Sequence, residues 1–392
     1  MLGGCTSAPI SPTEQTNPTI ITEPSAIEVS TPLPPKSTVV VSPTTEPNIG
    51  KLLWIFKPGS ADEPPCWVSP LTSATAFNRI VFVGASNVVG GKLGSLHALD
   101  AGNGSLLWSY EHNGHTPSTP TVADGVVYFG SEDHNIYAVD AHDGEGLWTF
   151  TTGGQVRSKP YVYETMVFMN SQDGHLYALN AKDGMLQWRY QFDEPVSDIA
   201  SLGSLPSSPV ADNGAAFIVG SDHMFRAINI SDGTLRWEYD IGSQVFGSPQ
   251  ATNGIVYVGS LNRSLYAFNS TDGSILWSHQ ADGAIISTPV VEDGRVFVSS
   301  NVISAIDAIS GTVLWQYDPD ILGSLGSPMI EGSNLYVASF DGHLFVLDRD
   351  HGTPLAVYAM GENIGQKAPA VVDGVMYIVA KDRSLYAVRM ID

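Results

Sequence analysis

Apolar residues in this chain fall in short runs rich in Val, Ile, Tyr, Phe and Trp, separated by Asp-Gly, Asn-Gly and Ser-Pro pairs. No stretch has the 3.6-residue period of an amphipathic helix. In the unit from residue 119 to 150, the pattern predicts strands at 120–123, 126–131, 136–141 and 146–150. Asp124-Gly125 and Asp143-Gly144 supply the positive φ that tight hairpins need. The pattern therefore predicts an all-β chain built from four-stranded antiparallel units.

A phrase of the form A-x-[DN]-x-x-x-G-x-x-x-W returns about every forty residues. Six complete copies cover residues 98–108, 138–148, 178–188, 227–237, 267–277 and 305–315. A seventh, at 346–356, has lost its alanine and its tryptophan. A fixed period of this size indicates a single repeat array rather than several domains.

An eighth copy of the phrase is split between the two ends of the chain. Its opening half starts at Ala387, and its closing half is Gly50 to Trp54. We therefore predict an eight-bladed β-propeller over residues 50–392. The segment 51–56 would add the outer strand to a last blade formed near residues 368–388, which leaves no open sheet edge.

The fixed residues of the phrase have packing roles in this prediction. The alanine leaves room for the neighbouring sheet, the Asp or Asn accepts bonds from turn amides, and the tryptophan fills the space between blades. The predicted docking residues are Trp54, Trp108, Trp148, Trp188, Trp237, Trp277 and Trp315.

The first 49 residues have a different composition. Residues 6–49 contain nine prolines, nine threonines and no aromatic residue, so they bury too little apolar surface to fold and are predicted to form a disordered linker. Before them, residues 1–5 resemble the lipobox that ends a bacterial lipoprotein signal peptide, with Cys5 as the lipidated residue. We expect an extracytoplasmic lipoprotein on the cell envelope or cell surface.

Charge and cysteine content narrow the classes of partner. The net charge is −22, of which the linker carries only −3, so about −19 falls on the propeller. Such a field repels phosphate backbones and argues against nucleic acid. If Cys5 is acylated, Cys66 has no partner for an intramolecular disulfide. No apolar run reaches eighteen residues, so the membrane attachment would depend on the lipid alone.

The repeated phrase resembles the tryptophan-docking motif of the pyrroloquinoline-quinone (PQQ) repeat. That family includes quinoprotein alcohol dehydrogenases and the BamB outer-membrane assembly lipoproteins, and the resemblance covers nearly all of residues 50–392. It implies the propeller fold. In the quinoproteins it also implies a central cofactor covered by an adjacent Cys-Cys disulfide, with calcium held by acidic and amide side chains.

This chain has no Cys-Cys pair and no C-x-x-C-H signature. It also has no G-x-S-x-G, H-E-x-x-H, phosphate-loop or EF-hand pattern. Six of its ten histidines lie in or beside predicted turns and form no short metal-ligand pair with one another: His115, His134, His142, His175, His223 and His343. We therefore expect no catalytic residue, no cofactor and no metal, although PQQ with calcium stays open.

The loops around the propeller axis are the most informative place for a binding site. Each inner strand is expected to begin near a proline, and the position three residues earlier is mostly apolar with a single charge, Arg157. This mouth could accept an extended apolar peptide or a ligand with one anionic group, with Trp67 and Phe246 as anchors; alternatively, these side chains only plug the channel. The eight residues are Trp67, Pro117, Arg157, Pro206, Phe246, Ile286, Leu325 and Gln366.

Three functions remain open from the sequence. The first is a non-enzymatic, lipid-anchored scaffold, monomeric and similar in build to BamB, that holds a protein partner at its rim. The second is a PQQ-dependent dehydrogenase. The third is a binder of cell-surface glycan or another ligand, which would need exposed aromatic residues such as Trp67.

Overall fold

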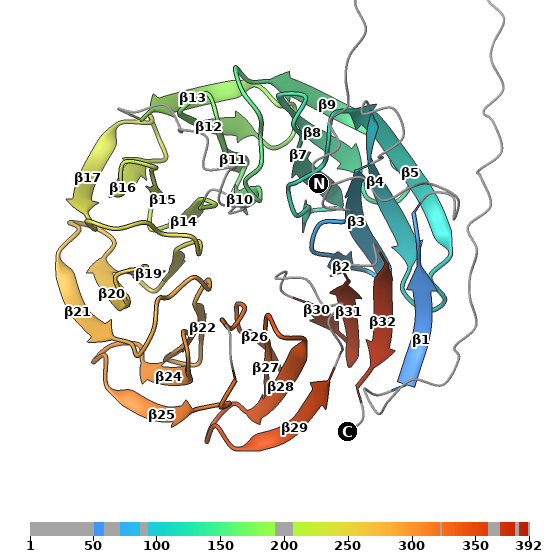
Figure 1. The fold of residues 1–392 in the computed structure, drawn as a ribbon. Coiled ribbons are helices and arrows are strands. Elements are labelled where there is room, and N and C mark those ends of the chain that lie inside the picture. The colour runs from blue at the N-terminus through green and yellow to red at the C-terminus, as the bar shows by residue number, and fades with distance from the viewer. Residues whose placement is uncertain are drawn as a thin grey trace, which may run out of the picture. The chain divides into compact units, whose positions relative to one another are not determined.

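The computed structural model describes residues 51–58, 71–86, 93–192, 207–321, 324–359, 369–380 and 384–390. In these residues, eight four-stranded antiparallel sheets follow one another around a ring (Figure 1). The predicted eight-bladed β-propeller is confirmed. The described residues contain no helix that could span a bilayer.

Blades 1 to 4 occupy the first half of the ring, and the strands of each run from the axis to the outside. Blade 1 is β2 (Thr75–Phe77), β3 (Ile80–Ser86), β4 (Leu93–Asp100) and β5 (Leu106–Asn113); blade 2 is β6 (Thr121–Ala123), β7 (Val126–Gly130), β8 (Asn135–Asp140) and β9 (Gly146–Thr151); blade 3 is β10 (Tyr161–Tyr163), β11 (Met166–Ser171), β12 (His175–Asn180) and β13 (Leu186–Gln191); blade 4 is β14 (Val210–Asp212), β15 (Ala215–Val219), β16 (Met224–Asn229) and β17 (Leu235–Asp240).

Blades 5 to 8 complete the ring, and the last of them contains both ends of the propeller. Blade 5 is β18 (Gln250–Thr252), β19 (Ile255–Gly259), β20 (Ser264–Asn269) and β21 (Ile275–Gln280); blade 6 is β22 (Val290–Glu292), β23 (Arg295–Ser299), β24 (Ile303–Asp307) and β25 (Val313–Tyr317); blade 7 is β26 (Met329–Glu331), β27 (Asn334–Ala338), β28 (His343–Asp348) and β29 (Pro354–Ala359); blade 8 is β30 (Ala370–Val372), β31 (Val375–Val379), β32 (Leu385–Arg389) and β1 (Lys51–Phe56).

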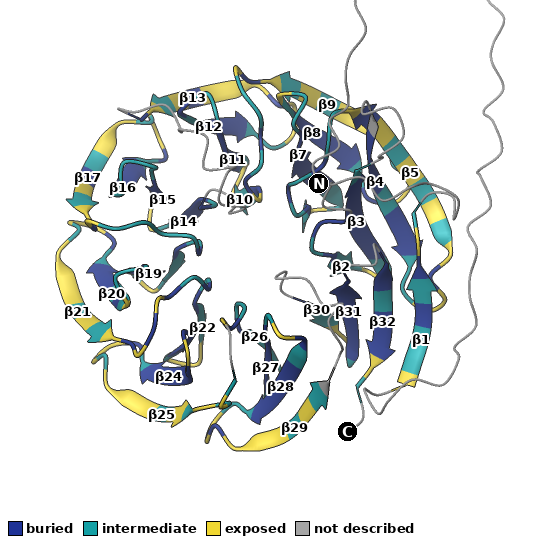
Figure 2. Ribbon diagram, in the orientation of Figure 1, coloured by how far each residue is buried: buried dark blue, intermediate teal, exposed yellow. Residues whose placement is uncertain are grey.

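Blade 2 shows why the sequence forms these sheets. Its four strands match the predicted ones to within about a residue. Asp124 and Gly125 both have positive φ in the first turn, at 49° and 77°, where glycine has no Cβ to clash. The middle strands β7 and β8 are almost entirely buried, while exposed residues alternate along the outer strand β9. Figure 2 shows the same gradient around the ring, with exposed positions gathered on the outer strands.

Each predicted docking tryptophan joins its blade to the next one. All seven indole Nε1 groups donate to a backbone carbonyl of the following blade, over 2.6 to 3.3 Å. The indole also covers the phrase glycine of that blade: a Cβ on Gly144 would lie 2.6 Å from a ring carbon of Trp108. The phrase therefore encodes a contact between blades, with glycine on one side and tryptophan on the other.

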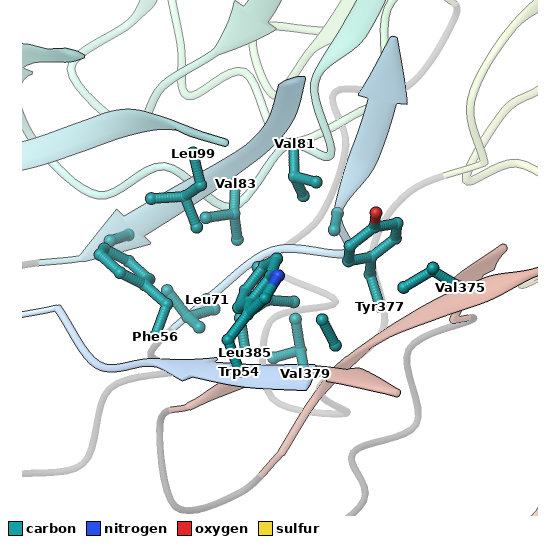
Figure 3. Packing of buried hydrophobic residues seen from close by; sticks show 13 residues of the cluster. Trp54, Phe56, Leu71, Val81, Val83, Leu99, Val375, Tyr377, Val379 and Leu385 are labelled. Atoms are coloured by element: carbon teal, nitrogen blue, oxygen red, sulfur yellow. The ribbon is translucent and has the colours of Figure 1, made fainter. Parts of the chain in front are cut away.

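The ring is closed by the pairing of β1 with β32, as predicted. The register places Trp54 opposite Ala387, so the two halves of the split phrase meet. Trp54 and Phe56 are buried, and Figure 3 shows them among side chains of blade 8 and blade 1. The N-terminal strand thus completes blade 8 and contributes to the core at the junction with blade 1.

The junction between blades 7 and 8 is different, because blade 7 has Ala356 in place of the tryptophan. Methionines occupy this junction instead. Met376 is fully buried and Met390 partly buried in the cluster that joins these two blades. The unbranched, flexible side chain of methionine fills irregular space. Because residue 356 is alanine, this junction has no indole hydrogen bond of the kind found at the other seven.

Candidate functional site

The connections between blades and the turns between second and third strands lie on one face of the ring. Backbone hydrogen bonds tie the two kinds of loop together, for example from Glu132 N to His115 O at 3.0 Å and from Leu261 N to Gln244 O at 3.0 Å. We call this the connection face. The docking tryptophans and the remaining turns belong to the opposite face.

The predicted mouth residues are only partly brought together here. Pro117, Arg157, Phe246 and Ile286 are partly exposed in the connections, whereas Trp67, Pro206 and Gln366 lie outside the described residues. Leu325 is buried in the core of blades 6 and 7, so its prediction as a mouth residue was wrong. In blade 1 the inner strand β2 follows Ala74 rather than a proline, and Leu71, also buried, holds the equivalent position.

Arg157, the one charge of the predicted set, is already neutralised. Its Nη2 lies 2.8 Å from Oε1 of Glu132, in the turn between β7 and β8, and about four fifths of each side chain is covered. A partly buried ion pair with this geometry has little electrostatic attraction left for a ligand. Arg157 therefore stabilises the loops of blades 2 and 3.

A second set of residues, those directly before the inner strands' prolines, forms an arc of hydrogen bonds around the axis. In each link a backbone amide donates to the hydroxyl of the equivalent residue in the next blade: Lys159 N to Ser208 Oγ, Ser208 N to Ser248 Oγ, Ser248 N to Thr288 Oγ1 and Thr288 N to Ser327 Oγ, at 2.9 to 3.0 Å. We call these five residues the axial arc. They are partly or fully exposed, while Ser158, Ser207 and Ser287, one position earlier, are buried.

Lys159 is the cation of the axial arc. No ion pair joins it to any residue in the part of the chain that the structure describes. Its side chain is open to solvent, yet burial lowers the pKa of its ammonium. A side chain at the axis is open to water along one direction and surrounded by blades in the others. It can therefore be solvent-exposed and still have a lowered pKa. The sequence analysis missed Lys159 because it compared positions three residues before the prolines rather than one.

A buried His112 lies at the core of the connection face near blade 2. Its Nε2 is 2.7 Å from Thr116 Oγ1, and its Nδ1 is 3.1 Å from Ser131 Oγ and 3.5 Å from Asp133 Oδ2. Burial opposes ionisation of Asp133, but bonds from His112, Tyr137 and Ser131 outweigh it and lower the pKa of that carboxyl. The residue types and order resemble a hydroxyl–imidazole–carboxylate triad.

The surroundings of His112 give it a structural role. His112, Thr116 and Ser131 are all buried, so no substrate could reach the Thr116 hydroxyl without unfolding the loops. The residues equivalent to His112, Ser131 and Asp133 one repeat later are Thr152, Ser171 and Asp173, and similar hydrogen bonds join them. Among the described residues, no group of three or more His, Cys, Asp or Glu side chains could hold a metal ion.

The outside of the ring carries exposed leucines, and the backbone explains them. In all eight blades the outer strand has a β-bulge at the residue before the docking position. The extra residue of a bulge is left unpaired and bends the strand. Five bulges present a leucine that is about half exposed: Leu107, Leu147, Leu276, Leu314 and Leu355.

In three consecutive blades, 5, 6 and 7, the outer strand that carries the exposed leucine has no charged residue. The outer strands β21, β25 and β29 contain no Asp, Glu, Lys or Arg. The outer strand β9 of blade 2 is also uncharged, but β5 and β13 in the neighbouring blades each carry a charge, as does β17. We call this surface the apolar flank of blades 5 to 7. Its exposed residues are Ile275, Leu276, Ile309, Val313, Leu314, Leu355 and Val357.

Fold and motif together define the class of protein: an eight-bladed propeller with the docking tryptophans of PQQ repeats. A family model described as "Outer membrane protein assembly factor BamB" matches residues 40–155, 92–249 and 242–388. The chain therefore belongs to the BamB family of PQQ-repeat proteins.

Solved structures agree with this fold. BamB from Moraxella catarrhalis is 16% identical, with a TM-score of 0.67 over 81% of this chain and 96% of that one. The computationally designed Ika8 protein is 15% identical, with a TM-score of 0.68 over 82% and 96% of the two chains. A europium-containing methanol dehydrogenase is 13% identical, with a TM-score of 0.62 over 84% of each chain. No curated protein matches. At these identities the likeness shows the fold alone.

Proposed function

We propose that this chain is a non-enzymatic scaffold outside the cytoplasm, which holds a protein partner against the apolar flank of blades 5 to 7. The observation that carries the proposal is this uncharged surface on a domain whose net charge is near −19. Elsewhere an uncharged outer strand stands alone: β9 lies between β5 and β13, which both carry charges, and such charges favour solubility. The flank has three uncharged outer strands in a row, and such a surface is typical of a protein interface.

The bulges also indicate the kind of contact. A bulged outer edge twists away from regular pairing and disfavours addition of another strand. The partner would therefore present an apolar face to the projecting side chains rather than extend the sheet. Membership of the BamB family supports a partner among envelope proteins, because the matching family model is described as an outer membrane protein assembly factor.

A matched pair of variants tests the flank. Leu276→Asp with Leu314→Asp places charges on it, and Leu107→Asp with Leu147→Asp makes the same change on blades 1 and 2. All four leucines lie at bulges and are 45 to 48% exposed. Affinity capture from detergent-solubilised membranes should lose the partner, identified by mass spectrometry, with the first pair only. Equal capture by both pairs, or equal loss, would contradict the proposal.

The lipid anchor is a separate part of this proposal. Cys5 lies outside the described residues, and the motif around it supports diacylation. Metabolic labelling with a radioactive fatty acid should mark the wild-type protein and leave Cys5→Ser unlabelled. Label retained by Cys5→Ser would refute the anchor without touching the flank.

We further propose that the chain acts without a quinone. The sequence lacks the Cys-Cys pair of the quinoproteins, and the likeness to methanol dehydrogenase is one of fold. Incubation with PQQ and calcium, followed by gel filtration, should leave no quinone absorbance with the protein. A stoichiometric quinone spectrum would replace this reading with that of a dehydrogenase.

A further inference from the structure

The axial arc has an unusual balance of hydrogen-bond donors. The hydroxyls of Ser208, Ser248, Thr288 and Ser327 each accept a backbone amide from the preceding blade. None of these four donates its own hydroxyl proton to another described residue. A hydroxyl carries one donor and two acceptor sites, so each keeps a proton to offer, and each is partly exposed.

Lys159 adds a positive charge to the same arc. In six blades the structure describes a proline at the start of the inner strand together with the residue directly before it. In five of these blades that residue is serine or threonine: Thr119, Ser208, Ser248, Thr288 and Ser327. In blade 3 it is Lys159, whose amide starts the arc of bonds. An ammonium without an ion pair to any described residue, next to a row of hydroxyl protons that no described residue accepts, is a set of groups that satisfies an anion.

The surrounding side chains narrow the kind of anion. Phe246 and Ile286 lie two positions before Ser248 and Thr288 in the same connections, and both are partly exposed. Of the two cations that the structure describes in these connections, Arg157 is paired with Glu132 and Lys159 has no ion pair. One cation on a strongly acidic domain matches a single negative charge better than a doubly charged phosphate.

From this arrangement we infer that Lys159 and the hydroxyls of the axial arc form a binding site for a carboxylate that carries an adjacent apolar group, such as the C-terminal residue of a peptide. The ammonium and the hydroxyls donate to the carboxylate oxygens, and Phe246 and Ile286 contact the apolar group. The site is on the axis, whereas the flank proposed for the partner is on the outside of blades 5 to 7. The proposal for the axial site and the proposal for the flank can therefore be tested independently of each other.

The test uses the full chain with its lysines reductively methylated with ¹³C, so that each dimethylamine is seen by NMR. N-acetylphenylalanine is the probe, and N-acetylphenylalaninamide, acetate and inorganic phosphate are the comparisons. The acid should shift the Lys159 resonance, identified by its loss in Lys159→Ser, and should raise the pKa of that amine. The amide should do neither.

Variants separate binding from folding. Lys159→Ser installs the hydroxyl used by other blades, so it should fold and melt as the wild type does while binding N-acetylphenylalanine about tenfold more weakly or worse. Lys182→Ser removes an exposed lysine of the opposite face and should bind normally. Equal binding of acid and amide, or unchanged binding by Lys159→Ser, would overturn the site. Phosphate binding as tight as the acid would overturn the carboxylate assignment, and acetate binding as tight would remove the apolar part.

Discussion

Two glycines of blade 6 allow the contribution of one tryptophan dock to be measured. Gly294 and Gly311 both have φ of +72°, and both lie in turns of the face that carries the tryptophans. A Cβ on Gly311 would lie 2.7 Å from a ring carbon of Trp277, whereas a Cβ on Gly294 would meet nothing within 4 Å. Alanine at either position bears the same backbone strain, so the difference between the variants reports the dock.

The magnitudes follow from the contacts. Alanine in the left-handed region costs about 1 to 2 kcal/mol, part of which is offset by the lower entropy of the unfolded chain. We therefore expect Gly294→Ala to lose about 1 kcal/mol. Gly311→Ala must also displace the indole, whose Nε1 bonds Ala308 O at 3.0 Å. Complete removal of a core tryptophan costs about 3 to 5 kcal/mol, so displacement should add about 2 kcal/mol or more.

Urea unfolding of both variants, followed by circular dichroism, measures the difference in the free energy of unfolding. A second arm repeats Gly311→Ala in a Trp277→Ala background, where its cost should fall to that of Gly294→Ala because the clashing ring is gone. Equal destabilisation by the two alanines in the wild-type background would refute the assignment of the phrase glycine as a docking surface.

The remaining predictions concern the closure and the core. Burial lowers the pKa of His97, which contacts Phe56 of β1, to about 4. Its unfolded pKa is near 6.5, so the unfolded chain binds a proton first and stability falls by up to about 3 kcal/mol as the pH drops from 6.5 to 4; His97→Gln should flatten that part of a curve of unfolding free energy against pH. Arg226 is fully buried against Asp222, so Arg226→Ala should cost about 3 kcal/mol or more by urea titration. Arg226→Tyr, which installs the residue found at this position in blades 2, 3, 5 and 8, should cost much less. Removal of residues 50–57 exposes β32 and should cause aggregation or early unfolding; a truncated chain that melts cooperatively at the wild-type temperature would contradict the closure.

The architecture could be predicted from the sequence because the repeated phrase encodes a contact between blades. Trp54 and Ala387 are far apart in the chain, yet each belongs to one half of that phrase, so their pairing could be predicted from the sequence. The connections carry no such code. In blade 1 the inner strand follows Ala74 and not Pro70, which defeats an alignment on prolines. Leu325, like Leu71, is buried, whereas the equivalent residues of blades 2, 3, 5 and 6 are partly exposed.

The candidate sites were harder to predict for related reasons. The exposure of Leu276 and Leu314 depends on a bulge, and a period of two along a strand gives no sign of an extra residue. Lys159 did leave a signal, since it interrupts a column of Ser and Thr before the prolines. Its importance depends on hydrogen bonds between blades that only the folded ring reveals.

The methionine-filled junction between blades 7 and 8 has a consequence for how the ring opens. The N-terminal strand secures blade 8 to blade 1 through the hydrogen bond of Trp54. Blade 7, on the other side of blade 8, is held by side-chain packing without an indole hydrogen bond. A fluctuation of the ring should therefore begin at this junction rather than at the chain ends. Blade 8 would swing out as an intact sheet still attached to blade 1, and the buried side chains of this junction, Met376 among them, would become accessible to solvent before those around Trp54.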